Sequence, residues 1–367
     1  MKKLLMMIGA AAVAVGANAD VFYVTNTVGA VSVTPTSDVK WLFKIDPDAG
    51  KAYPGANSET VPNGSWSANT ALALDPQKTV TIPRKVTVDG VDYPINEIAP
   101  RCFLADTTIE NVIALDNIDT VQWRAFIDST TKHVLFKGPN TASDGTQPLA
   151  WLKPTVSGKF RVFEKANSLK LVIVGPGLKA YYDADRMYMP TASNASILVP
   201  DFTIVGNWSA LNDSTVGGTN NRVVRYGPDS DFAMAMGDTE MTFYPNNEAG
   251  LTNVLSFAST IKTAFDMDVK IAITNRIEMS EGVQITEAML QNVTLEAPPW
   301  YLTFAVKSQA QLDNVLAAVS ADVPIIIDID GAGKNQITVP NGRKVAILAK
   351  SGWTFGKKLN GLIISFF

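Results

Sequence analysis

Residues 95–103 have the sequence Ile-Asn-Glu-Ile-Ala-Pro-Arg-Cys-Phe, and residues 118–126 repeat the pattern as Ile-Asp-Thr-Val-Gln-Trp-Arg-Ala-Phe. The step from Ile95 to Ile118 recurs from Phe103 to Phe126, so the two copies belong to a 23-residue repeat. The pattern continues into residues 109–112 and, after the same step, into residues 132–135. Self-similarity at a fixed period of this length is the signature of a repeat architecture.

A third, degenerate copy contains Phe163, Leu169 and Val172. It begins later than the 23-residue step would place it, because an insert rich in Pro, Gly, Ser and Thr occupies residues 139–160. Ordering one 23-residue unit costs about 35 kcal/mol at about 1.5 kcal/mol per residue. Burying six or seven large apolar side chains returns only about 10–20 kcal/mol. The repeats must therefore stack on one another, and we expect the flanking segments to pack on both ends of the stack.

The residues before the first copy carry a family resemblance. Residues 80–83, Val-Thr-Ile-Pro, precede residues 86–93, Val-Thr-Val-Asp-Gly-Val-Asp-Tyr. Together with the repeats, they resemble the start of a BspA-like leucine-rich repeat array over about residues 78–182. The resemblance implies a solenoid of short strands and turns in a secreted or surface bacterial protein for adhesion to a host or matrix. The chain departs from the family pattern in its few copies, its insert and Lys132, which the 23-residue spacing places at an aliphatic core position.

Residues 1–19 have the features of a secretory signal peptide. A basic start is followed by an apolar run and by Ala17-Asn18-Ala19, which fits the small-x-small rule for cleavage. We expect cleavage between Ala19 and Asp20, which would change the formal net charge from −4 to −6, and a secreted or cell-surface location. No later apolar stretch is long enough for a transmembrane helix, so we expect no membrane span in the mature chain.

The composition argues against most kinds of chemistry. One cysteine excludes an intramolecular disulfide, and one cysteine with one histidine makes a Cys/His zinc cluster implausible. We expect Cys102, which aligns with Ala125, to be a small buried residue, and His133 to be a surface or hydrogen-bonded residue. With 31 basic and 35 acidic residues, the chain has no nucleic-acid footprint. We therefore predict no catalytic residue, no metal site and no cofactor.

The candidate binding residues come from the strand positions that the 23-residue spacing turns outward. They are Ile113, Phe136 and Ile173, with Val134 and Leu171 beside them. An open sheet face normally alternates to polar residues, so an apolar stripe there has two explanations. Either the insert or another domain covers the stripe, or it binds a protein or glycan partner at a cell surface or in a matrix.

The predicted fold class is mainly β with some α. It comprises a signal peptide (1–19), an N-terminal β cap region (20–77), a short leucine-rich-repeat solenoid (78–182), a turn-rich connecting region (183–248) and a C-terminal domain (249–367). In the last, the pattern Ile277-x-Met279-x-x-Gly282 recurs further along the chain as Ile337-x-Val339-x-x-Gly342. This weak repeat fits either an α+β domain or parallel β-helix-like rungs, with helices at about 251–265 and 310–319.

These observations favour a non-enzymatic adhesion or matrix-interaction protein. One alternative is a self-associating structural component of an extracellular layer. The other is a carbohydrate-active enzyme with a β-helix domain, which would need acidic residues that converge in a cleft. Seven tryptophans are spread along the chain, and they could stack on sugars where exposed, although such residues usually lie in the core.

Overall fold

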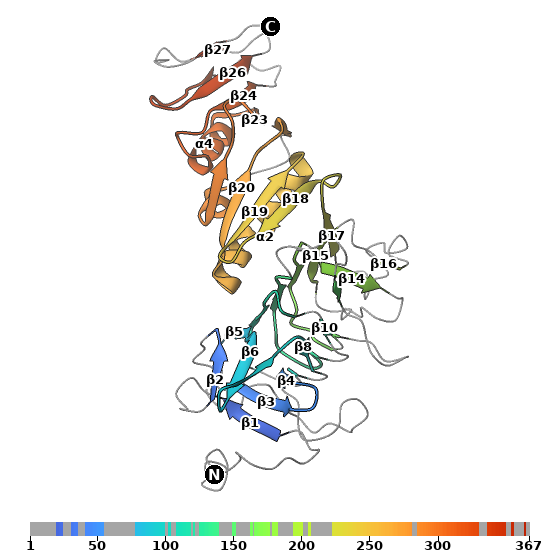
Figure 1. Ribbon diagram of the computed structural model, residues 1–367. Helices are drawn as coiled ribbons and strands as arrows, with labels where there is room; N and C mark the ends of the chain where they lie inside the picture. Colours follow the sequence, from blue (N-terminus) through green and yellow to red (C-terminus); the bar gives the residue numbers. More distant parts are fainter. Residues whose placement is uncertain are drawn as a thin grey trace. The chain divides into compact units, whose positions relative to one another are not determined.

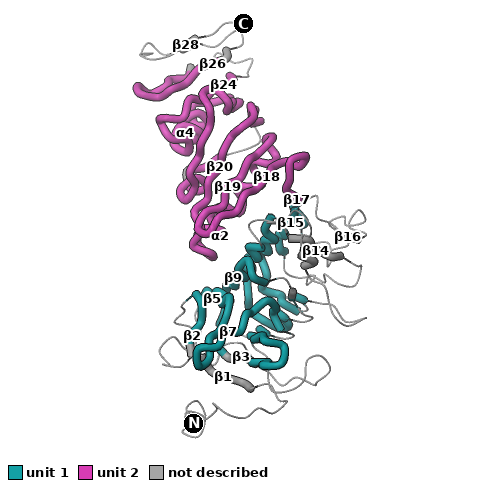
Figure 2. Tube along the Cα trace, viewed as in Figure 1, with its two compact units in different colours: residues 1–224 teal, residues 225–367 magenta. Residues whose placement is uncertain are grey.

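The fold is taken from a computed structural model, and the chain divides into two compact units, Met1–Val224 and Arg225–Phe367 (Figures 1 and 2). The structure describes residues 20–24, 31–35, 41–54, 78–99, 102–103, 108–118, 120–121, 125–138, 149–151, 162–163, 165–176, 178–182, 194–200, 205–206, 222–280, 285–329, 336–349, 354–355 and 363–364. Both units are β-rich. Within these residues, no helix combines the length and the apolar character needed to cross a membrane.

The N-terminal region forms two small antiparallel sheets. One contains β1 (Asp20–Val24), β3 (Trp41–Asp46) and β4 (Lys51–Pro54), and the other contains β2 (Val31–Thr34), β6 (Lys85–Val88) and β7 (Val91–Pro94). Trp41, Phe43 and Ile45 are buried and belong to the same core cluster as the repeats. The N-terminal β region thus closes one end of the repeat stack.

The repeats form a six-stranded sheet in which neighbouring strands follow one another along the chain. Its strands are β5 (Thr79–Ile82), β9 (Asn111–Ala114), β11 (His133–Phe136), β13 (Leu171–Val174), β15 (Ser196–Pro200) and β17 (Arg222–Tyr226). The pairs from β5 to β15 are parallel. Further parallel strands pair along a second side: β8 (Glu97–Ile98) with β10 (Thr120–Val121), and β14 (Leu178–Tyr182) with both β12 (Leu149–Trp151) and β16 (Val205–Gly206).

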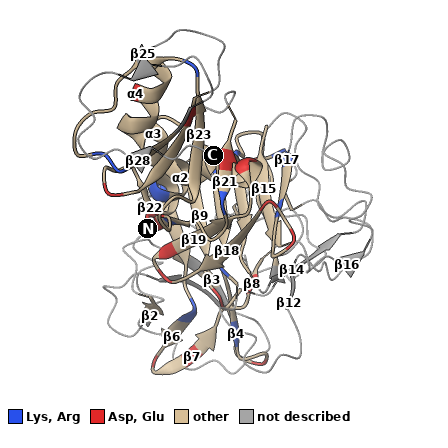
Figure 3. Cartoon of the chain, turned by 90° about the horizontal axis from the view of Figure 1, so that it is seen from above, with Lys and Arg blue, Asp and Glu red and all other residues tan. Residues whose placement is uncertain are grey.

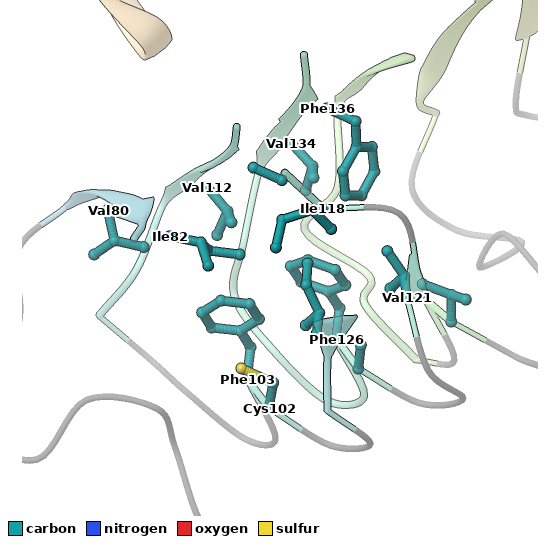
Figure 4. Packing of buried hydrophobic residues seen from close by; sticks show 14 of the residues in the cluster. Val80, Ile82, Cys102, Phe103, Val112, Ile118, Val121, Phe126, Val134 and Phe136 are labelled. Atoms are coloured by element: carbon teal, nitrogen blue, oxygen red, sulfur yellow. The ribbon is translucent and has the colours of Figure 1, made fainter. Parts of the chain in front are cut away.

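A stack of phenylalanines connects the repeats inside this core. The ring of Phe126 lies between those of Phe103 and Phe163, at centroid distances of 4.9 and 5.0 Å. The backbone N–H of Phe103 donates to the carbonyl of Ala125 at 2.8 Å, so the turns pair through backbone as well. Cys102 is fully buried beside this stack, as predicted (Figure 4). The aligned phenylalanines of the three copies therefore do stack in space.

The strands do not follow the same 23-residue spacing. The 23-residue step would place Leu135 beside Val112, but Val112 pairs with Val134. The turn between Phe126 and β11 is one residue shorter than the corresponding turns of the other two copies. The core position that holds Ile109 and Leu169 in those copies is therefore taken by Thr131, which is fully buried. Lys132 was wrongly predicted at that position. It lies directly before β11, with its side chain 44% exposed.

The described residues of unit 2 form three further sheets, of four, five and two strands, with mainly parallel pairing. One has the order β18 (Phe232–Met236), β19 (Glu240–Pro245), β20 (Asp268–Ala272), β22 (Val293–Glu296). Another has the order β21 (Ile277–Met279), β23 (Leu302–Val306), β24 (Ile325–Ile329), β26 (Val345–Ala349), β28 (Ile363–Ile364), and β25 (Gln336–Ile337) pairs with β27 (Thr354–Phe355). The helices are α2 (Glu248–Phe265), α3 (Glu287–Leu290) and α4 (Gln309–Ala318).

The five-stranded sheet of unit 2 has a rung-like arrangement. Ile277 pairs with Leu302, Leu302 with Ile325 and Ile325 with Val345, so each step along the chain adds one parallel strand to the same sheet. Parallel strands in chain order match the β-helix-like alternative better than an α+β domain with antiparallel pairing. The structure also differs from the predicted connecting region, because β15 and β17 extend the sheet of unit 1 whereas β18 and β19 belong to unit 2.

The weak internal repeat of unit 2 is visible in the caps of its helices. Asn247 caps α2 and Ser308 caps α4, each by accepting from a backbone N–H in the first turn. The first helical side chain then bonds a later segment. Glu248 accepts from the N–H of Ser280 at 2.5 Å, and Gln309 accepts from the N–H of Thr338 at 2.7 Å. These contacts tie each helix start to the chain near the strand that carries the repeated motif.

Candidate functional site

The predicted binding stripe lies on the six-stranded sheet of unit 1, but its residues occupy both faces. Val134 and Phe136 belong to the interior cluster together with Val80 and Val112 (Figure 4). The prediction that they face outward was wrong, because a one-residue shift in register moves every side chain of a strand to the opposite face. The outward position beside Ile113 is held by Leu135.

The true outward apolar positions form the outer apolar row, which consists of Ile113, Leu135, Ile173 and Leu198. Their exposed fractions are 8%, 0%, 0% and 0%. Leu171, also predicted as a binding residue, is 3% exposed. An apolar stripe on the sheet could be covered by another part of the chain or bind a partner, and the burial of these side chains favours coverage. The row is therefore part of the packing of the protein, and a docking surface must be sought elsewhere on the sheet.

A ladder of polar residues crosses the beginning of the same sheet. Thr79, Asn111 and His133 stand side by side on β5, β9 and β11. Asn111 donates from Nδ2 to Thr79 Oγ1 at 2.8 Å, and His133 Nδ1 lies 2.6 Å from Asn111 Oδ1. Because the amide oxygen only accepts, His133 donates through Nδ1–H in this arrangement. Burial, with the nearby charge of Lys132, holds the pKa of His133 below its ordinary value.

Charged residues precede these strands and form what we call the strand-start row: Lys78, Glu110, Lys132 and Lys170. Backbone hydrogen bonds link its neighbours, from Lys132 N to Glu110 O at 2.7 Å and from Lys170 N to Lys132 O at 2.7 Å. Glu110 pairs with Lys132 at 3.2 Å and with Lys78 at 3.6 Å. The hydrogen bond from Lys132 and the charges of both lysines lower the pKa of Glu110.

The strand-start row is exposed and carries more positive than negative charge. The side chain of Lys78 is 80% exposed, that of Lys132 is 44% exposed, and Lys170 is exposed. Figure 3 shows the other described charged residues, blue and red, spread over many elements. The 23-residue spacing hid this row, since it assigned Lys132 to the core. The recurrence of Lys or Glu directly before β5, β9, β11 and β13 is the signal that could have revealed it.

The polar ladder and the strand-start row bring hydrogen-bonding and charged groups together at the start of this sheet. His133 hydrogen-bonds the uncharged side-chain amide of Asn111, at 2.6 Å between Nδ1 and Oδ1. Across the described residues, no three His, Cys, Asp or Glu side chains are arranged to hold a metal ion. Exposed ammonium groups, such as those of Lys132 and Lys170 before neighbouring strands, can meet the negative groups of a partner.

Comparisons with known proteins add little to this description. No family model matches the chain, and no curated protein matches it. Among solved structures, it is similar to a leucine-rich cell surface protein from Faecalibacterium prausnitzii, with 13% sequence identity and a TM-score of 0.27. The alignment covers 93% of this chain and 94% of the other. A likeness at this TM-score carries no argument for fold or function.

Proposed function

We propose that this protein is a secreted or cell-surface member of the BspA-like leucine-rich repeat class and that it binds a surface or matrix partner without catalysis. The observation that carries the proposal is the exposed strand-start row of unit 1, in which Lys78, Lys132 and Lys170 lie along one edge of stacked strands. The signal-like residues 1–19 support export.

The stack of unit 1 is regular from β5 to β13, where each strand is preceded by one charged residue. Each rung adds one residue to the same edge, so the repeat builds an extended surface from side chains far apart in the sequence. Glu110 lies between Lys78 and Lys132 and pairs with their ammonium groups at 3.6 and 3.2 Å. Lys170 follows Lys132 along the row, so the positive charges outnumber the negative one and favour a partner that carries negative groups. The proposed partner is a protein or glycan at a cell surface or in a matrix.

The proposal is tested by surface binding of the purified protein to a panel of cells, glycans and matrix proteins. The double variant Lys132→Ser with Lys170→Ser removes two charges from the row and should weaken binding at least fivefold, mainly through slower association. The matched control, Lys51→Ser with Lys307→Ser, removes the same charge from exposed positions elsewhere and should bind normally. Absence of binding to the whole panel, or equal loss in both variants, would refute the proposal.

A further inference from the structure

A strained turn in unit 2 holds an aromatic residue where the backbone favours glycine. Residues 298–301, Pro-Pro-Trp-Tyr, connect β22 to β23, and the N–H of Tyr301 closes the turn on the carbonyl of Pro298 at 3.3 Å. Trp300 occupies the third position with a φ of 66°. Proline at the second position and positive φ at the third define a type II turn, whose third position is ordinarily Gly or Asn.

Trp300 is held in this conformation by its neighbours. Its N–H donates to the carbonyl of Pro324, on the next rung, at 3.3 Å. A bulky residue in the left-handed region is an outlier that costs of order one to a few kcal/mol and persists only where the surroundings impose it. Trp300 and Tyr301 are both partly exposed, and Pro298 and Pro299 are exposed. Since glycine would remove the strain, the indole itself needs an explanation.

A cation lies beside the turn. Ile277 N donates to Tyr301 O at 2.8 Å, and Ile277 pairs with Leu302, so Arg276 stands next to Tyr301 at about one strand spacing, about 4.8 Å. Arg276 is exposed, and it forms no ion pair with any residue that the structure describes. Lys344, three strands from Arg276 in the same sheet, contacts Asp322 through the backbone carbonyl at 3.4 Å and through the carboxylate at 3.9 Å.

We propose that the turn at 298–301 is a carbohydrate-binding platform for a pyranose that carries a carboxylate. The apolar C–H face of the sugar ring stacks on the partly exposed indole of Trp300, since aromatic rings offer large, rigid apolar faces. The guanidinium of Arg276 binds the carboxylate, because its planar fork matches a carboxylate in two parallel hydrogen bonds. The site lies in unit 2 and is independent of the strand-start row in unit 1.

Isothermal titration of the purified protein tests this site, with oligogalacturonate as the probe and its full methyl ester as the uncharged counterpart. Trp300→Asn removes the ring but suits a left-handed backbone. We expect it to bind oligogalacturonate about tenfold more weakly, with an unfolding temperature that is unchanged or higher. Arg276→Gln, at an exposed position, should bind oligogalacturonate about fivefold more weakly and the methyl ester as the unaltered protein does.

Two controls separate this inference from the proposed function. The Lys132→Ser, Lys170→Ser double variant should bind oligogalacturonate with unchanged affinity. If that variant loses the sugar while Trp300→Asn keeps it, the platform is refuted and the strand-start row remains. No binding of oligogalacturonate to the unaltered protein refutes the platform whatever the surface panel shows. A Trp300→Asn protein that unfolds several degrees earlier assigns the indole to packing, and Arg276→Gln with unchanged affinity contradicts the assignment of the carboxylate.

Discussion

The substitution Thr131→Val should make unit 1 more stable. Thr131 is fully buried, and among the described residues its Oγ1 has no hydrogen-bond partner. The other two copies place Ile109 and Leu169 at the same point of the repeat, and both are fully buried. Valine has almost the shape of threonine, so the substitution replaces an unsatisfied hydroxyl by a methyl group without a new cavity or clash.

The magnitude follows from the burial of this hydroxyl. A buried polar group without a hydrogen-bond partner costs about 1–3 kcal/mol, and a buried methyl group contributes up to about 0.8 kcal/mol. Because part of the gain is lost to small readjustments of packing, we expect an increase of about 1–2 kcal/mol in the free energy of unfolding. For a unit of roughly 150–250 residues, this corresponds to an unfolding temperature about 2–8 °C higher.

Differential scanning calorimetry measures this change and separates the transitions of the two units. The control is Thr294→Val on β22, where the threonine is exposed and the change should stay within about 0.5 kcal/mol. The reasoning is refuted if Thr131→Val lowers the unfolding temperature of unit 1 or leaves it unchanged. Either result would mean that the hydroxyl of Thr131 is satisfied, and that the shortened turn places it differently from Ile109 and Leu169.

Three further substitutions test other parts of the structure. Phe136 is 1% exposed in the core, so Phe136→Ser should lower the free energy of unfolding of unit 1 by at least about 4 kcal/mol. The variant should unfold at a lower denaturant concentration than the unaltered protein. Unchanged stability would mean that the side chain of Phe136 faces outward after all. Gly250→Ala should lower the calorimetric transition of unit 2 by at least about 2 kcal/mol, because a Cβ there would lie 1.9 Å from the carbonyl oxygen of Asp231; an unchanged transition would contradict that close approach. His133 has a lowered pKa, so below pH 6.5 the unfolded chain takes up the proton first and stability falls as the pH is lowered. His133→Gln replaces the only histidine of the chain. In urea titrations, the variant should therefore lose less stability between pH 7.5 and pH 5 than the unaltered protein does. Equal losses would refute the burial of His133 as the cause.

The repeat could be predicted from the sequence because its strongest signal is a local spacing of apolar residues. The distances that join Ile95, Ile98 and Phe103 to their counterparts are constant, and Phe103 and Phe126 do stack at 4.9 Å. Two helices of unit 2 were likewise predicted to within a few residues, because their apolar periodicity is continuous. The rungs at β15 and β17 were missed, since the spacing between copies there no longer repeats.

The candidate site was harder to predict because a register error of one residue moves every side chain of a strand to the opposite face of the sheet. An error of one position in β11 interchanged the core and the surface, so Phe136 was assigned to binding and Lys132 to packing. The platform at Trp300 has no signal in hydrophobic periodicity. In the sequence, Pro299 is typical of the second position of a type II turn, but Trp300 stands where such a turn ordinarily has Gly or Asn. The positive φ of Trp300 becomes known only from the fold.

The shortened turn shows how the stack tolerates irregular copies. Asp128 and Lys165 both lie two residues after their phenylalanines, with φ values of 55° and 56°, so the two turns begin alike. Ser129 and Ala166 then donate to the carbonyls of Phe126 and Phe163 at 3.3 and 3.1 Å. The missing residue must therefore fall after Ser129 and before Lys132, where the core residue changes to Thr131. Pairing on both sides of the turn is kept, but the turn buries two hydroxyls, those of Ser129 and Thr131, that have no hydrogen-bond partner among the described residues. Since Thr131 takes the position that Ile109 and Leu169 hold in the other copies, an apolar substitution there should recover part of this cost.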